Sequence, residues 1–256
     1  MSNYYHGAKA SKQATSVSTP AVADSSIHLI VGTAPVHTVG GKVNEPVYAS
    51  NYAEAVAAMG YSDEWDKYDI CEEIYSSFKL YSNGPIIMVN VLDPTKHLKG
   101  AETAEKTLAG GITELPYEAV SNTVEVKGYD GEDSLTEAYT RGEDYDLFYT
   151  DGVLRLERIE SGKIKADNAR LNIKFNSVDP SKVTKKEIIG GYDTNTNKSS
   201  GFELVDSVYP KYGVIPTLFL APNFSTDSEV AAIMAAKAEN INGLFTGKAI
   251  IDADTN

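Results

Sequence analysis

The chain has 256 residues, and 42% of them are hydrophobic, which is enough for one large or two small domains with a buried core. The formal net charge of -13 repels nucleic-acid phosphates and anionic lipid headgroups, so we expect no binding to nucleic acid. The most apolar windows, residues 86–92 and 214–221, fall well short of the ~20 residues of a membrane span, so we expect no membrane insertion.

The N-terminal segment is rich in Ser, Thr and Ala and lacks the continuous apolar stretch of a secretory signal. We therefore expect no Sec-dependent export, and we predict that residues 1–25 form a flexible arm. Cys71 is the single cysteine and can form no intrachain disulfide, which fits a protein that is made in a reducing compartment or is indifferent to redox conditions. We expect Cys71 to be a core residue.

Residues 26–98 alternate between strand and helix patterns. The apolar run 27–31 predicts a buried strand, and Asn51 with Glu54 and then Gly60 predicts the start and end of a short helix. A second helical stripe precedes a turn at 82–85 and a strand at 86–92; the stripe comprises Ile70, Ile74 and Phe78. Because parallel strands need crossovers that cover the sheet, this order predicts a helix-covered sheet.

Residues 99–180 change to a period of two, which is typical of antiparallel strands. Alternating runs on both sides of Asp151-Gly152 predict a hairpin. Further strands are predicted where apolar and polar residues alternate, with apolar positions at Val124, Val126, Leu171, Ile173 and Phe175. The segment therefore predicts a small antiparallel β-sandwich or barrel, in which residues 99–108 fit a helix or a strand equally.

Helix and strand patterns alternate again in residues 181–256. The apolar run 214–221 predicts a buried strand, although Pro216 is typical of a sheet edge. Thr226 and Glu229 fit a capping box for the next helix, and Asn242-Gly243 fits its end. Residues 249–251 predict a last strand with no helix after it, so we expect an incomplete core and a truncated protein.

These segments together predict an α/β fold with a discontinuous core. Residues 26–98 and 181–256 would form a helix-covered mixed or parallel sheet, and residues 99–180 would interrupt it as the small antiparallel β domain.

The chain offers few residues for chemistry. Its four histidines, His6, His28, His37 and His97, lack the close spacing of zinc sites, so we expect no metal. The acidic stretch of Glu143, Asp144, Asp146 and Asp151 lacks the ligand pattern of a calcium loop and fits a solvated hairpin face better.

The C-terminal segment has two further candidates. Residues 243–249 end in Gly-Lys-Ala, but the spacing is one residue short of a phosphate loop and Ala249 replaces the Mg-binding hydroxyl, so we interpret them as a helix stop and turn. Asp252 and Asp254 follow a strand, where α/β enzymes often place catalytic groups, yet no nucleophile or base accompanies them. We expect no catalytic residues and no cofactor.

Several stretches in the same order resemble one known family. They are Tyr4-Tyr5-His6-Gly7, residues 27–34, residues 142–145 with Asp151-Gly152 and 159–164, residues 178–183 and 188–191, and residues 218–225, 229–230 and 250–254. These stretches are similar to contractile-tail sheath proteins of phages and prophage devices, and the similarity spans nearly the whole chain.

The resemblance implies a structural subunit and no enzyme. Such a subunit polymerises with its own copies around a tail tube protein, contacts baseplate and tail terminator proteins, and contracts to drive the tube through the host envelope. It implies a protein made in the host bacterial cytoplasm and located in the virion tail. Because family members continue beyond this length, we expect the 256-residue chain by itself to be monomeric or weakly associated.

Two other functions stay open. Residues 99–180 could form a module that binds a carbohydrate or a host surface. The α/β part could instead belong to a nucleotide-using enzyme, although the sequence has no phosphate loop.

Overall fold

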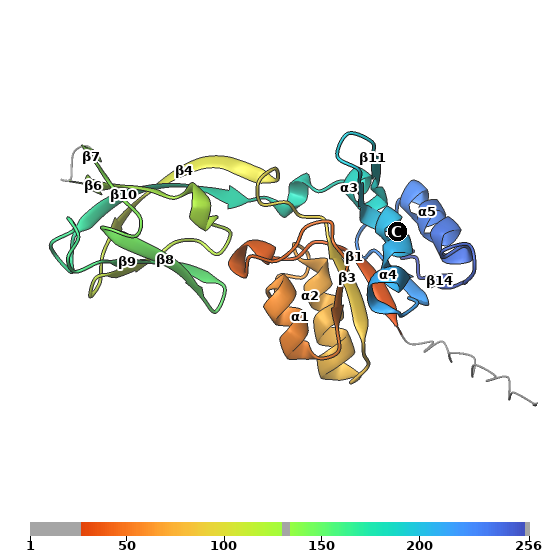
Figure 1. The fold of residues 1–256 in the computed structure, drawn as a ribbon. Coiled ribbons are helices and arrows are strands. Elements are labelled where there is room, and N and C mark those ends of the chain that lie inside the picture. Colours follow the sequence, from red (N-terminus) through yellow and green to blue (C-terminus); the bar gives the residue numbers. More distant parts are fainter. Residues whose placement is uncertain (1–26, 130–133, 254–256) are drawn as a thin grey trace, which may run out of the picture.

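The computed structural model describes residues 27–129 and 134–253, and the predicted arm at residues 1–25 lies outside them. The fold is mixed α/β with several sheets, as expected. Figure 1 shows two lobes, one of helices around a sheet and one of strands. We call them the α/β lobe (residues 27–97 and 179–253) and the β lobe (residues 98–178).

A five-stranded sheet lies at the centre of the α/β lobe. Its strand order is β14-β13-β1-β3-β2, and all neighbouring pairs are parallel except β2 with β3. His28 pairs with Leu218 on one side and with Ile86 on the other, so strands from opposite ends of the chain lie side by side. The strands are β1 (His28–Gly32), β2 (Val47–Ala49), β3 (Ile86–Asn90), β13 (Leu218–Leu220) and β14 (Lys248–Ala249).

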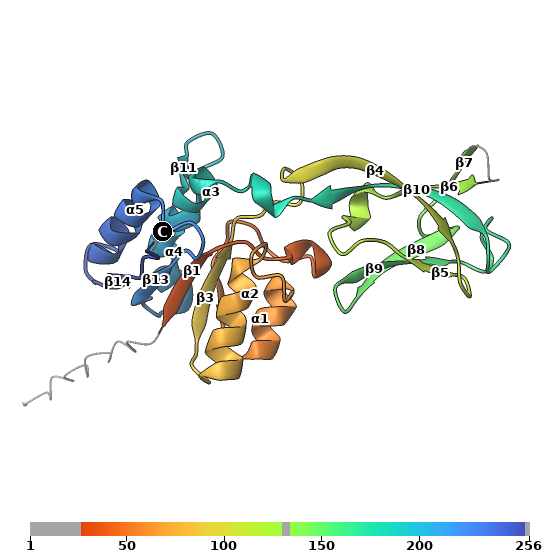
Figure 2. The same ribbon diagram turned by 180° about the vertical axis from the view of Figure 1, so that it is seen from behind.

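Helices cover both faces of this sheet, as the two views in Figures 1 and 2 show. Along β1, Ile30 packs into an apolar cluster with α1 and α2, while Leu29 and Val31 pack into a second cluster with α4 and α5. Because both faces are buried, the strand is apolar throughout. The helices are α1 (Tyr52–Met59), α2 (Asp69–Tyr75), α3 (Lys185–Ile189), α4 (Val205–Tyr212) and α5 (Ser228–Glu239).

The ends of α1 follow the predicted chemistry. The Asn51 side chain accepts a hydrogen bond from the backbone nitrogen of Glu54, and the Gly60 backbone nitrogen closes the helix on Val56. The Glu54 carboxylate caps Ser50 rather than Asn51. The second helical stripe is α2, which continues as one π-helical turn, η2 (Ser76–Leu80).

The β lobe consists of two antiparallel sheets that enclose one apolar cluster. One has the order β4-β10-β6-β7 and the other β5-β9-β8. Their strands are β4 (Leu98–Thr107), β5 (Ile112–Glu114), β6 (Glu125–Tyr129), β7 (Ser134–Tyr139), β8 (Tyr145–Thr150), β9 (Val153–Arg158) and β10 (Arg170–Val178). The ambiguous residues 99–108 therefore form a strand, β4, apart from Leu108.

Two predictions in this lobe are confirmed. The hairpin of β8 and β9 turns at Asp151 and Gly152, both at positive φ, as a two-residue turn requires. In β10, Leu171, Ile173 and Phe175 are buried in the cluster, and the residues between them face outward.

Four short 3-10 helices and one hairpin complete the elements of the described residues. They are the 3-10 helices η1 (Val36–Thr38), η3 (Ser121–Thr123), η4 (Pro180–Lys182) and η5 (Gly201–Leu204), and the hairpin of β11 (Gly191–Asp193) and β12 (Lys198–Ser200), with η5 directly after the hairpin.

The C-terminal part requires four corrections. The run 214–221 forms a strand only over Leu218–Leu220, because Pro216 has no N–H for the sheet ladder. The N-cap of α5 is Asp227 and not Thr226, since the Asp227 carboxylate accepts from the backbone nitrogen of Glu229. The helix ends at Glu239, before Asn242-Gly243, and the last strand covers Lys248–Ala249 rather than 249–251.

Candidate functional site

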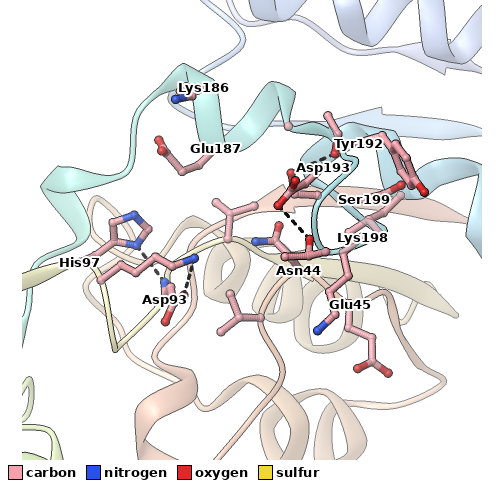
Figure 3. A pocket seen from close by; sticks show the side chains of 18 residues that line it. Asn44, Glu45, Asp93, His97, Lys186, Glu187, Tyr192, Asp193, Lys198 and Ser199 are labelled. Carbon is pink, nitrogen blue, oxygen red and sulfur yellow. Dashed lines mark hydrogen bonds and ion pairs between the residues drawn. The ribbon is translucent and has the colours of Figure 1, made fainter.

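A groove of about 800 Å³ lies in the α/β lobe beyond the carboxyl end of β3. Open α/β sheets commonly bind ligands at this end, so the groove is the first candidate for a functional site. Figure 3 shows its walls, which come from residues 43–45, the turn 91–97, α3 with residues 190–191, and the β11–β12 hairpin.

The turn after β3 is held by its own side chains. The backbone nitrogen of Asp93 donates to Nδ1 of His97 at 2.9 Å, so this ring nitrogen is an acceptor. The Asp93 carboxylate accepts from the Thr95 hydroxyl at 2.7 Å and pairs with Lys96 at 3.2 Å. These contacts fix the turn where the chain leaves the α/β lobe.

The remaining acidic side chains of the groove also serve local structure. Glu187 accepts from the backbone nitrogen and the hydroxyl of Thr184 in the capping box of α3. Asp193 accepts from the backbone nitrogen of Asn195 at 2.8 Å, and Glu45 pairs with Lys211 at 2.7 Å. The Thr196 hydroxyl also donates to Asp193, at 2.9 Å and within the same hairpin turn. The described lining places no general base beside this hydroxyl other than the carboxylate that holds the turn, so the groove shows no catalytic set.

Two buried ionisable groups lie between β1 and α2. Burial raises the pKa of the Asp69 carboxyl to about 7, although Thr33 donates to it from its backbone nitrogen and its hydroxyl. Burial likewise raises the pKa of the Cys71 thiol to about 12. Cys71 is fully buried and free, so its prediction as a core residue is confirmed and its thiol is not activated.

The histidines in the described residues have separate partners. His28 Nδ1 lies 2.6 Å from Glu73, His37 Nε2 lies 3.0 Å from the Tyr117 carbonyl, and His97 holds the groove turn. His6 lies outside the described residues. In residues 27–129 and 134–253, no group of three or more His, Cys, Asp or Glu side chains could hold a metal ion.

The four acidic residues predicted to form a solvated hairpin face differ in exposure. Glu143, Asp146 and Asp151 are exposed, as a solvated face requires. For Asp144 that expectation was wrong: its side chain is buried and accepts from the backbone nitrogens of Thr140 and Lys163, both at 2.8 Å. These two bonds lower the pKa of the Asp144 carboxyl.

The last two candidates have structural contacts. Residues 243–247 form the turn that returns the chain from α5 to β14, with Gly247 donating to the Ala238 carbonyl. The Asp252 carboxylate accepts a hydrogen bond from the Ser225 hydroxyl at 2.8 Å, and the Asp252 backbone nitrogen donates to the oxygen of that hydroxyl. Asp254 lies outside the described residues.

The groove was not predicted from the sequence, although one sequence pattern indicates it. Asp93 and His97 directly follow the predicted strand 86–92, and polar residues at the carboxyl end of a parallel strand meet at the ligand edge of the sheet. Asn44 and the β11–β12 hairpin carry no such signal, because they reach the groove through tertiary packing alone.

The comparisons with known proteins point in one direction. No protein-family model matches the chain. A tail sheath protein of Burkholderia phage BcepMu is 28% identical to it over 253 residues, which are 98% of this chain and 49% of that protein. The chain thus spans about half the length of this curated relative, and the resemblance to a phage tail sheath protein, a structural protein, is confirmed. Among the described residues, no helix has the length and apolar character needed to span a bilayer.

Proposed function

We propose that this chain is part of a structural subunit of the contractile tail sheath of a phage or a phage-derived injection device. The observation that carries the proposal is the similarity to a phage tail sheath protein, which extends over 98% of the chain without depending on one motif. The subunit polymerises with its own copies around a tail tube protein and contacts baseplate and tail terminator proteins. It belongs in the virion tail after synthesis in the bacterial cytoplasm.

The two lobes take different parts in this proposal. Residues 26–98 and 181–256 form the core that stacks in the sheath, and residues 99–180 are an inserted domain. Separate apolar clusters support this division, as does the single sheet that joins β1 and β3 with β13 and β14. A tube of rigid subunits can shorten when one set of subunit contacts is exchanged for a more favourable set, which is a bistability of interfaces.

The contacts of the groove carboxylates support a purely structural role. The groove carboxylates of Asp93 and Glu187 accept hydrogen bonds from their own turn and helix end. We therefore propose no enzymatic activity and no cofactor.

The test is immunogold electron microscopy of particles induced from bacteria that carry the gene. Antibody against the 256-residue chain should decorate the outside of the tail along its whole length, in extended and contracted particles. Label confined to the tail tip would favour the alternative, in which the β lobe binds a carbohydrate or a host surface. Unlabelled tails beside labelled soluble protein would contradict the sheath role and favour an enzyme.

A further inference from the structure

In the described part of the chain, the two lobes touch at a neck and at a second place. The chain crosses between them twice at the neck, where the Asp179 backbone nitrogen donates to the His97 carbonyl at 2.8 Å. Apart from the neck, the loop between β5 and β6 reaches back to the α/β lobe. There the Tyr117 hydroxyl donates to the Tyr61 carbonyl at 2.9 Å, and Glu118 pairs with Lys67 at 3.0 Å. We call this second contact the junction.

His37, from η1 of the α/β lobe, contacts the β lobe at the junction. Its side chain is buried, and its Nε2 lies 3.0 Å from the backbone carbonyl of Tyr117. The ring also meets the rings of Tyr117 and Tyr149 edge to face, at centroid distances of 5.9 and 6.1 Å. All three contacts cross from one lobe to the other, so they exist only while the junction is closed.

One hydrogen bond fixes the tautomer of the neutral His37 ring. A carbonyl can only accept, so Nε2 carries the proton and donates it to Tyr117. The other ring nitrogen, Nδ1, is buried and has no hydrogen-bond partner among the residues that the structure describes. A second proton would therefore sit on a buried donor without an acceptor, which costs free energy in addition to the buried charge.

The surroundings of His37 offer little compensation for that charge. The groups that face it from the β lobe are the Tyr117 and Tyr149 rings and the Glu118 carboxylate, which is engaged with Lys67. Tyr68 packs against Tyr117 from the α/β lobe, at a centroid distance of 6.1 Å. Burial lowers the pKa of His37, and the Tyr117 carbonyl and Glu118 oppose this effect only in part.

We propose that His37 is an acid-sensitive latch between the two lobes: the junction is closed while the imidazole is neutral and opens when it takes up a second proton. Opening exposes the ring to water and frees the β lobe to move about the neck. The inference rests on the junction alone and holds whether or not the sheath role is correct.

The latch predicts a defined response to pH. In the open state His37 titrates near the ordinary value of about 6.5, and in the closed state it resists protonation. Between pH 7.5 and 5.5 the ratio of open to closed molecules should therefore rise up to about tenfold. This range stays above the sequence pI of about 4.8, where the protein carries little net charge.

The experiment measures the distance between the lobes in the full chain by double electron–electron resonance. Nitroxides are attached at Ala57→Cys on α1 and Glu160→Cys on the β lobe, two exposed positions, while the buried Cys71 stays unlabelled. The distance distribution should be narrow at pH 7.5 and gain a broad component at pH 5.5. In His37→Gln, whose amide can donate to Tyr117 without titrating, the distribution should stay narrow at both pH values.

His97→Gln is the matched control, since His97 lies at the neck, and its distribution should respond to pH like the parent. An unchanged distribution in the parent, or equal broadening in the parent and His37→Gln, would overturn the latch. If His37→Gln does not fold, Tyr117→Phe provides the second test. It removes the hydroxyl that donates to Tyr61 and keeps the ring and the carbonyl that contact His37. The broadening should therefore move to higher pH, and an unmoved midpoint would contradict the proposal.

Discussion

The Asp69 carboxylate accepts a hydrogen bond from the backbone nitrogen of Thr33 at 2.6 Å. Asp69 is the first residue of α2, and Thr33 directly follows β1, so this bond joins the first strand to the helix that covers it. The carboxyl is fully buried, and burial raises its pKa to about 7. The contact that orders the end of β1 therefore depends on a group that changes charge near neutral pH.

Replacing this carboxyl by an amide should change the pH dependence of stability. Folded Asp69 holds its proton up to about pH 7, while in the unfolded chain an aspartate loses it near pH 4. Its stabilising contribution is thus present below about pH 4 and is lost as pH rises through 7. Asp69→Asn does not titrate, so between pH 5.5 and 8 the unfolding free energy of the variant should rise relative to wild type, by roughly 2 kcal/mol.

Urea unfolding at several pH values measures this difference. Asp66→Asn, at an exposed carboxylate, is the control and should follow the wild-type curve. A difference between Asp69→Asn and wild type that is independent of pH would show that the carboxyl does not titrate in this range.

Gly32 should be restricted by the same carboxylate. A Cβ at this position would lie 2.7 Å from the Asp69 Cγ, closer than real contacts allow. Gly32→Ala should therefore cost about 1–3 kcal/mol as an overpacked core substitution. In the Asp69→Ala background the obstacle is absent, so the same change should cost much less. Equal costs in both backgrounds, measured by urea unfolding in a double-mutant cycle, would mean that Asp69 is not what excludes a side chain there.

The sequence patterns predicted the elements whose packing is repetitive. The alternation of Leu171, Ile173 and Phe175 was sufficient for β10 because one face of that strand packs on the β-lobe cluster. Asp151-Gly152 was sufficient for the hairpin because only a few residue pairs tolerate positive φ at both turn positions.

Sequence patterns did not predict the features that depend on partners far apart in the chain. The run 214–221 is apolar throughout, yet its strand extends only over the three residues that pair with β1. His37 and Tyr117 are 80 residues apart, and nothing in either segment indicates that they meet. The junction and the groove both arise from tertiary packing, so a sequence without its fold could not reveal them.

An alanine at Gly152 should destabilise the protein by more than the backbone strain at this turn alone would. Gly152 and Gly142 have similar φ angles, 79° and 83°, so alanine at either position costs about 1 kcal/mol of backbone strain. A Cβ on Gly142 would meet no atom of the described residues within 4 Å, whereas one on Gly152 would collide with the Tyr117 ring. Gly152→Ala should therefore destabilise the protein by more than Gly142→Ala in thermal unfolding. Equal losses would show that the Tyr117 ring can move aside freely.

The start of α5 distinguishes two adjacent residues that the sequence pattern could not separate. The Asp227 carboxylate accepts from the backbone nitrogen of Glu229, and Lys185 lies 3.1 Å from the same carboxylate. Thr226 is exposed and does not cap the helix. Asp227→Ala should therefore lower the melting temperature by roughly 2–4 °C, as expected for the loss of an N-cap in a protein of this size, and Thr226→Ala should change it little.

Asp227→Asn separates the cap from the ion pair, because asparagine caps helices well but cannot pair with Lys185 as an anion. Its melting temperature should stay close to that of wild type, whereas a loss as large as that of Asp227→Ala would assign the effect to the charge. The reverse order, with Thr226→Ala the more damaging change, would restore Thr226 as the cap.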